Sequence, residues 1–402
     1  MWNKIQHNIH RFYRIFLHET KESFEDAGTV LIFIVAAILY PMLYSTGYVN
    51  ETIREIPVAL VDLNHTTLSR RYAMLLDATE QVSVTARPGS LKDAEKLFYQ
   101  GIVHGVVLIP VSFQEDILKS TQANVVVYCD AGRFFVYKQV YTGASYATGV
   151  MNAGVEIKGM LAGGNSWDDA MNHYQAVSPQ MFDLYNPASG YATFIIPGIL
   201  IIVIQQSLLV GIGLLFGKHY ERNKLMAINM AKNNLQNISV ILSKSLVYVM
   251  LYLITTMVTL VIFYHWLDFP EKTSFLKIYP LLILYLFAVS FMGICIGTWF
   301  QKRVHALMFL VFMSPMVFFL CGIAWPMESL PVGIKMLGYL FPTTPMLPAF
   351  LKLRIMGGDY GSVRNEIMIL LAQLGGYFIL AMLSLKLSAK RNTRVSLRFP
   401  EQ

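Results

Sequence analysis

Long apolar runs without charge alternate with short charged stretches along most of the chain. The longest of these runs extends from Tyr191 to Gly217, and about 20 apolar residues suffice for a helix to cross the hydrocarbon core of a bilayer. Five further runs occupy residues 27–47, 240–264, 278–300, 305–324 and 365–387. The pattern predicts six transmembrane helices.

One polar segment, residues 48–190, separates the first predicted span from the second. Within it, strand-like runs such as Pro57–Val61 and Gly105–Ile109 alternate with helix-like stretches such as Leu68–Asp77. Strands that alternate with helices are typical of a compact α/β domain. The predicted fold class is therefore an α-helical polytopic membrane protein with six transmembrane helices and an inserted α/β domain.

Residues 1–26 combine apolar and basic positions at helical spacing. The apolar positions are Ile5, Ile9, Phe12 and Phe16, and the basic ones are Lys4, Arg11, Arg14 and Lys21. An amphipathic basic helix of this kind lies on a membrane surface, whereas a helix on a soluble domain is the alternative. The apolar run that follows at once favours the membrane surface.

Charge placement sets the predicted orientation. Only 14% of the residues are charged, against about 25% in soluble domains, and basic residues gather after the second span, in the loop 301–303 and in the tail 388–402. Positive charge marks the cytoplasmic side, so both termini are expected in the cytoplasm of a bacterial inner-membrane protein. Segment 48–190 and the Pro- and aromatic-rich loop 325–364 then lie outside.

The first span is predicted to be an uncleaved anchor. The segment before it is too long for the charged start of a secretory signal, and its exit lacks a small-residue cleavage site. The amphipathic helix and the first span therefore stay joined.

Several other chemistries find no support in the sequence. The net charge of +7 is not accompanied by a basic-aromatic stripe, which argues against nucleic acid. The three cysteines have no metal-ligand spacing, and Gly211–Lys218 lacks the spacing of a phosphate-binding loop. Asp168 and Asp169 are adjacent and face different directions on a helix, so with His173 they indicate a solvated face. We expect no catalytic site, no metal and no cofactor bound by this chain.

The order of short motifs resembles the membrane subunit of an ABC transporter of the type-2 exporter family. The quoted stretches are Ile56–Asp62 with Leu68–Arg70, Gly101–Pro110 with Phe113, Asn186–Pro187 with Pro197–Leu200, Ser243–Tyr248, and Gly322 with Trp325–Pro326 and Phe341–Pro345. They are similar to the family's IPVAVVD…SR, IP-x-x-F, NP…PGLL, GK-x-x-P-Y and G…P…PxTP elements. The resemblance implies a separate ATPase subunit carrying ATP and Mg, and a second permease copy or a paralogue. We also expect a periplasmic adaptor as a partner.

The segment after the second span departs from the family pattern. Where the family has RExExGT, this chain has Lys218-His219-Tyr220-Glu221-Arg222-Asn223-Lys224. A short charged helix between two spans would project from the membrane and pass movement in a partner to both spans, whereas a solvated loop is the alternative. Residues 218–239 are therefore the predicted coupling loop, and the candidate ATPase contacts are Lys218, His219, Glu221, Arg222, Asn223, Lys224, Arg11 and Arg14.

The most polar group deep in a predicted span is Gln205, Gln206 and Ser207. Such side chains face the interior of a helix bundle. They either line a transport pathway or form hydrogen bonds between helices.

These observations predict the permease of an ATP-driven exporter of drug-like, lipid or other amphiphilic substrates. The alternative is a non-transporting membrane receptor or assembly scaffold with an extracytoplasmic binding domain. An intramembrane enzyme would need a polar catalytic cluster within the spans, and the sequence offers none.

Overall fold

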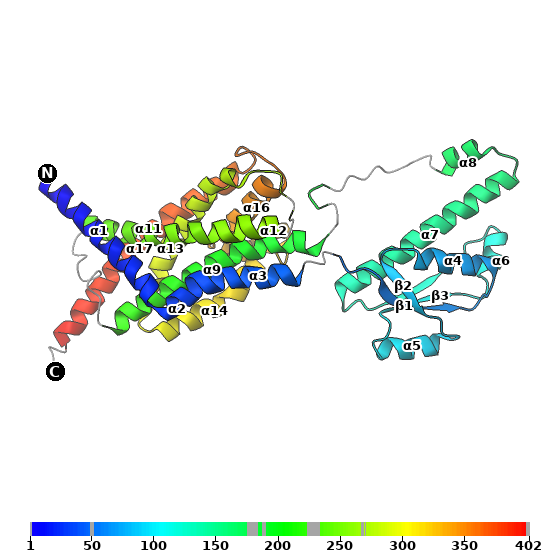
Figure 1. Cartoon of the computed structure of the whole chain (residues 1–402), viewed down its shortest axis with the longest axis horizontal. Helices are drawn as coiled ribbons and strands as arrows, with labels where there is room; N and C mark the ends of the chain where they lie inside the picture. The colour runs from blue at the N-terminus through cyan, green and yellow to red at the C-terminus, as the bar shows by residue number, and fades with distance from the viewer. Residues whose placement is uncertain are drawn as a thin grey trace. The chain divides into compact units, whose positions relative to one another are not determined.

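The computed structural model describes residues 2–48, 52–174, 184–186, 190–222, 234–266, 269 and 271–398. The chain divides into two compact units, one of residues 1–51 and 184–402 and the other of residues 52–183. The first is helical and the second contains the sheet (Figure 1).

Within its described residues, the helical unit holds six helices that are long and apolar enough to cross a membrane. They are Ala27–Gly47, Tyr191–Glu221, Gln236–Trp266, Tyr279–Gly297, Arg303–Leu320 and Arg364–Lys390. The first comprises α2 (Ala27–Val30), a π-helical segment (Leu31–Ala36) and α3 (Ala37–Gly47), and the second is α9 (Tyr191–Glu221). The others belong to α11 (Asn234–Met257) with a π-helical turn (Val258–Ile262) and α12 (Phe263–Trp266), to α13 (Tyr279–Gly297), to α14 (Arg303–Leu320), and to α17 (Arg364–Arg398).

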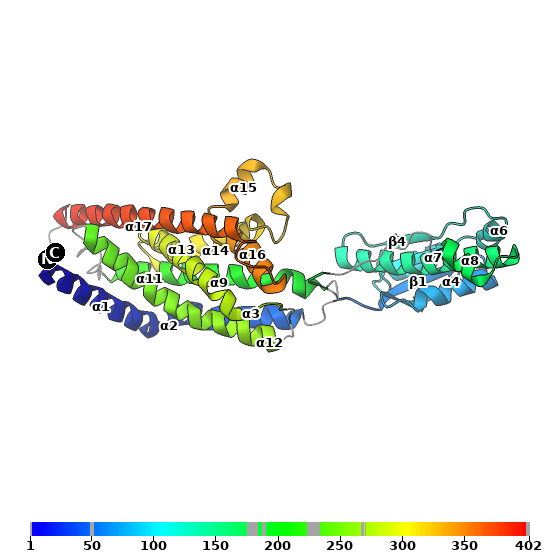
Figure 2. The same cartoon turned by 90° about the horizontal axis from the view of Figure 1, so that it is seen from above.

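Helix α1 (Trp2–Glu25) precedes the first span and packs on α11. Asp26 separates α1 from α2 with an extended backbone, and its side chain accepts a hydrogen bond from the backbone of Thr29, which caps the new helix. In both views, α1 and the last turns of α17 lie at the same end of the helical unit (Figures 1 and 2).

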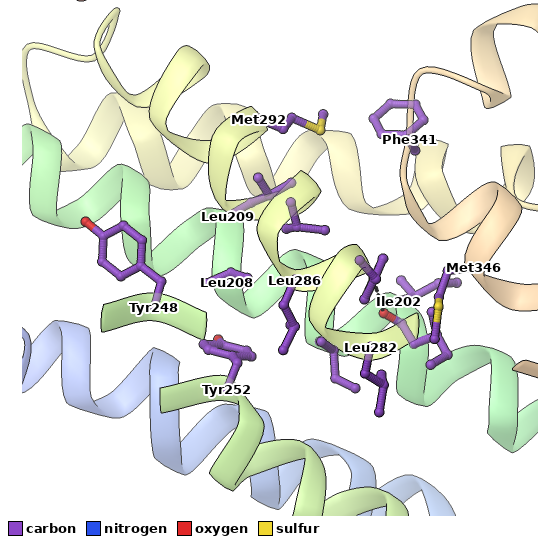
Figure 3. Close-up of a cluster of buried hydrophobic side chains, with 14 of the residues drawn as sticks. Ile202, Leu208, Leu209, Tyr248, Tyr252, Leu282, Leu286, Met292, Phe341 and Met346 are labelled. Carbon is purple, nitrogen blue, oxygen red and sulfur yellow. Dashed lines mark hydrogen bonds between the residues drawn. The ribbon is translucent and has the colours of Figure 1, made fainter. Parts of the chain in front are cut away.

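The core of this unit lies where α9, α11 and α13 meet. Figure 3 shows Leu208 and Leu209 of α9 beside Leu286 of α13 and Tyr252 of α11, all of them buried. Glycine permits the closest approach in this region, because a Cβ on Gly211 would lie 1.8 Å from a ring atom of Phe33. Small residues allow membrane helices to pack this tightly.

The predicted outer loop 325–364 contains several short helical elements. They are a 3-10 turn (Met327–Ser329), α15 (Val332–Gly338), α16 (Thr343–Phe350) and a π-helical turn (Leu351–Ile355). Most of α16 is buried in the helical unit, where it contacts α9 and α17. A further 3-10 turn, Phe275–Lys277, precedes α13.

The second unit is built on a four-stranded sheet with the order β2-β1-β3-β4. The strands are β1 (Ile56–Asp62), β2 (Val82–Ala86), β3 (Gly105–Ile109) and β4 (Val126–Cys129), with β4 antiparallel to its neighbour. The helices are α4 (Thr67–Asp77), α5 (Leu91–Tyr99), α6 (Phe113–Leu118), α7 (Phe134–Ala162) and α8 (Trp167–Tyr174).

Helices cover both faces of this sheet. Side chains alternate between the two faces along a strand, so Val58 and Leu60 pack with Tyr72 of α4 and with α7, whereas Ala59 packs with Ala94 of α5. The predicted α/β fold of this segment is therefore present as a compact unit with its own core.

Candidate functional site: a buried ionic cluster

Three acidic residues near the end of α1 share one face. Glu19, Glu22 and Asp26 recur at intervals of three and four residues, which brings side chains together on a helix. The exposed fractions of Glu19, Glu22 and Asp26 are only 1%, 6% and 8%. A buried carboxylate is costly unless it is paired and hydrogen-bonded, so each of these acids requires a partner from the bundle.

Glu19 finds its partners on α11. Its carboxylate forms an ion pair with Lys244 and accepts a hydrogen bond from the hydroxyl of Tyr248. The Lys244 ammonium also lies 5.0 Å from the centre of the Phe216 ring. The side chains of Lys244 and Glu19 are 2% and 1% exposed, so this contact fixes α1 against α11 out of reach of water.

Glu22 and Asp26 connect α1 to two further helices. Glu22 forms an ion pair with Lys218 in the last turns of α9, and Lys218 Nζ also lies 3.8 Å from Asp26 Oδ1. Asp26 Oδ1 accepts a hydrogen bond of 2.9 Å from Arg303 Nη1 at the start of α14. One carboxylate therefore bridges the ends of α9 and α14.

Glu221 completes the arrangement at the end of α9. Its Oε1 accepts a hydrogen bond of 3.0 Å from the backbone N–H of Arg303, and its Oε2 lies 3.6 Å from Arg303 Nε. A Cβ on Gly217 would lie 2.7 Å from the Arg303 backbone nitrogen, so only glycine allows this approach. We call the connected set the ionic cluster: Glu19, Glu22, Asp26, Lys218, Glu221, Lys244, Tyr248 and Arg303.

Glu19, Glu22 and Asp26 are held in their charged form. Burial by itself raises the pKa of Glu19, but Lys244, His219 and Tyr248 outweigh it and lower this pKa to about 2. Burial also acts to raise the pKa of Glu22, but the contacts with Lys218 outweigh it and lower the pKa. For Asp26, burial is likewise outweighed, by the hydrogen bonds from Thr29 and by the nearby cations, so its pKa is lowered too.

Two histidines border the cluster. The rings of His18 and His219 lie 6.2 Å apart, and one ligand atom from each, with one from Glu19, could meet within 4.8 Å. Both Glu19 oxygens are already bound, by Lys244 and Tyr248. A cation there would compete with the Lys244 ammonium and the Tyr248 hydroxyl for Glu19, and we assign no metal to this group.

Comparison with known proteins agrees with the architecture and with the motifs. The sequence pattern that describes ABC-2 family transporter proteins matches residues 28–383, most of the chain. The chain belongs to the ABC-2 transporter family. No curated protein matched it. The chain is thus a membrane-spanning ABC-2 permease subunit, and this family implies an ABC ATPase as its partner.

The geometry of the permease revises the predicted coupling segment. Lys218, His219 and Glu221 continue α9 by one turn rather than starting a separate helix. Lys218 and His219 are 2% and 8% exposed, and Lys218 is paired with Glu22 inside the permease. That these two residues contact the ATPase stays a prediction. Glu221 is partly exposed and Arg222 is exposed, whereas Asn223 and Lys224 lie outside the described residues.

The two basic candidates on α1 of the permease differ in position. Arg14 is exposed and Arg11 is half-buried, and burial lowers the pKa of Arg11. Only Arg14 of these two therefore presents a fully accessible charge.

The polar group within α9 of the permease is buried. The backbone N–H of Thr343 in α16 donates to Gln205 Oε1 at 3.0 Å, and the Ser207 hydroxyl donates to the carbonyl of Val203 at 2.6 Å. Gln206 is 8% exposed, and its amide atoms make no hydrogen bond with the described residues. Gln205 thus joins helices and Ser207 bonds within its own helix, whereas the role of Gln206 stays a prediction.

Most of the ionic cluster was not predicted from the sequence. Glu19 and Glu22 carried a usable signal, because a spacing of three residues places them on one face of α1. Lys244 and Tyr248 lie in the Ser243–Tyr248 motif, where a charged residue within an apolar run indicates a buried partner. The local sequence around Lys244 and Tyr248 does not indicate which acidic residue of α1 would pair with them.

Proposed function

We propose that this permease is the membrane subunit of an ATP-driven exporter of amphiphilic molecules, and that the ionic cluster couples it to its ATPase. The observation that carries the proposal is the attachment of α1, and of the Asp26 junction that follows it, to three membrane helices through buried charges. Helix α1 precedes the first span and bonds to α9 through Glu22 and to α11 through Glu19, and Asp26 at the junction bonds to Arg303 of α14.

Ion pairs suit this task better than apolar packing. A buried ion pair is strongly directional, and breaking it leaves an uncompensated charge that costs about 3–5 kcal/mol. A displacement of α1 therefore moves the ends of α9, α11 and α14 with it. An ATPase that pushes on α1, or on the exposed Arg222 at the end of α9, would act on all three helices together.

The other parts of the proposal follow from orientation. Basic residues after α9, before α14 and along the end of α17 support a cytoplasmic location for these regions and for both termini. The sheet-containing unit would then lie in the periplasm and guide substrate or receive an adaptor. ATP and Mg would bind the ATPase dimer, and two permease copies, or this chain and a paralogue, would form the pathway in a bacterial inner membrane.

A non-transporting receptor or scaffold is the competing function. It would use the sheet-containing unit for binding and would need no ATPase. The buried connection between α1 and the three spans is the feature that favours the exporter, because a receptor with an outside binding unit does not require it.

The test is co-purification of the permease with a candidate ABC ATPase from its gene neighbourhood. We expect capture by the wild type and loss of capture in the Arg14→Glu/Arg222→Glu variant, since both side chains are exposed. Lys277→Glu is the matched control, because Lys277 is exposed and precedes α13 at the opposite end of the bundle.

Each result has a defined meaning. Capture that survives the double reversal removes these two residues from the interface and leaves the exporter proposal intact. No capture by wild type, with the permease folded and the ATPase active, would refute the exporter and favour the receptor.

A further inference from the structure

A hollow of about 470 Å³ lies at one edge of the sheet in the second unit. Asn64 and Thr66, in the loop after β1, form one wall, and Val111, Gln114 and Leu118, in the segment after β3, form the other. Its volume falls within the usual range for small-molecule sites.

The topology of the sheet places this hollow at a defined point. After β1 the chain passes through α4 to β2 on one side, and after β3 it passes through α6 to β4 on the other side. The loops at the carboxyl ends of β1 and β3 thus diverge, and ligands of open α/β sheets bind in the crevice at such a switch point. The residues that line the hollow and the strand order of the sheet are two separate observations, and both point to the carboxyl ends of β1 and β3.

The wall after β1 is fixed by its own hydrogen bonds. Asp62 Oδ1 accepts hydrogen bonds from the backbones of Asn64 and His65 at 2.9 and 3.0 Å, and Oδ2 accepts from the Ser69 hydroxyl at 2.7 Å. Thr66 caps α4 through the backbone N–H of Ser69. A wall held in this way is ordered before a ligand arrives, which reduces the entropy lost on binding.

The chemistry of the lining selects an uncharged ligand. The charged side chains of the lining, Glu115 and Lys119, form an ion pair with each other, so the hollow carries no net formal charge. Gln114 Oε1 accepts a hydrogen bond of 3.4 Å from the backbone N–H of Leu68, and the Gln114 amide nitrogen makes no hydrogen bond within the described part of the chain. Asn64 Nδ2 donates to the carbonyl of Val111, and Asn64 Oδ1 accepts from the Thr66 hydroxyl. The amide of Asn64 keeps one further hydrogen and one further lone pair, so it can still donate to and accept from hydroxyl groups of a ligand.

An apolar rim adjoins these polar groups. Val111 and Leu118 are 69% and 72% exposed, and both line the hollow. Together they offer aliphatic surface beside the amides of Asn64 and Gln114. The hollow therefore matches a molecule that has a hydrogen-bonding head next to an aliphatic body.

We propose that this hollow is a binding site for a neutral amphiphile whose headgroup carries hydroxyl groups. The head would bond to Asn64, Thr66 and Gln114, and the aliphatic part would cover Val111 and Leu118. The site does not depend on the proposed transport function, because a receptor would use it equally well.

Hydrogen–deuterium exchange of the full chain in lipid nanodiscs tests the site. The probe is hexyl β-glucoside below its micelle concentration, compared with glucose and with hexyl sulfate. We expect slower exchange in residues 63–68 and 111–119 only with the glucoside, by roughly tenfold at ten times Kd for amides that exchange through local opening. Peptides from α5, on the other face of the sheet, should not change.

Leu118→Asn and Gln114→Ala should each reduce this protection at least severalfold. Ile102→Asn is the matched control, since Ile102 is 53% exposed and lies outside the hollow. No protection of the two segments in wild type would overturn the site. Equal protection by glucose would overturn the role of the aliphatic rim, and equal protection by hexyl sulfate would overturn the selection for a neutral head.

Discussion

Replacement of Lys244 by methionine should strongly destabilise the permease. Methionine keeps most of the side-chain volume but leaves the Glu19 carboxylate, 1% exposed, without its cation. The pKa of Glu19 is about 2 against an ordinary 4.5, and each unit is worth about 1.4 kcal/mol, so burial and the partners together favour the charged form by a net of about 3 kcal/mol. Removal of one partner of a buried pair costs about 3–5 kcal/mol, which agrees with that figure.

The companion change Glu19→Gln makes this prediction specific. Glutamine can still accept the hydrogen bond from Tyr248, so Glu19→Gln alone leaves Lys244 as the unpaired charge. The double variant Glu19→Gln/Lys244→Met removes both charges, and replacement of a whole buried pair is often close to neutral. The double variant should therefore be more stable than either single variant.

Unfolding of the purified permease in mixed micelles, followed at increasing denaturing detergent, measures the three free-energy differences. The coupling energy of the cycle isolates the pair from general damage. The same cycle applied to the exposed pair Lys96 and Asp93 gives the baseline for a surface ion pair. Additive effects of Glu19→Gln and Lys244→Met would refute the argument that the two charges compensate each other.

Three further outcomes follow from the same geometry. The depressed pKa of Glu19 contributes stability that is complete above about pH 4.5 and is lost as pH falls toward 2; an acid titration of unfolding should show this loss in wild type and much less of it in Glu19→Gln. Gly217→Ala should separate the end of α9 from the start of α14 and cost at least about 1–3 kcal/mol, whereas Gly375→Ala, with open space at its Cβ, should stay within about 0.5 kcal/mol; equal midpoints would contradict the close contact. Gln205→Leu should leave the buried N–H of Thr343 unpaired and cost about 1–3 kcal/mol, and unchanged amide exchange at the start of α16 would count against this bond.

The pattern of apolar and polar residues was sufficient to predict the membrane spans and the strands of the sheet. It was not sufficient to predict where the helices end. Lys218 follows a long apolar run and was expected in a separate charged segment that contacts the ATPase, with a solvated loop as the alternative. Helix α9 instead continues past Lys218, whose charge is paired with Glu22. Lys218 and Glu22 lie far apart in the sequence. The helical repeat of 3.6 residues describes neighbours within one helix and carries no information on a contact between two helices.

The helix α16 shows a second limit of the sequence pattern. Pro345 and Pro348 made this stretch look like a loop, but Pro345 lies in the first turn, where the missing N–H has no helical partner to lose. Proline frequency alone could not reveal that α16 is buried against α9 and α17.

The separation of Glu19 from Lys244 also sets an order of events during synthesis. The two residues are 225 positions apart, and at about 5–20 residues per second the ribosome needs roughly 11–45 s to cover that distance. During this interval α1 and the first span exist without the lysine that neutralises Glu19, so the acidic face of α1 must remain hydrated at the membrane surface. Helix α1 can therefore reach its final position against α11 only after α11 has been made and inserted, so its synthesis and its docking are separate events.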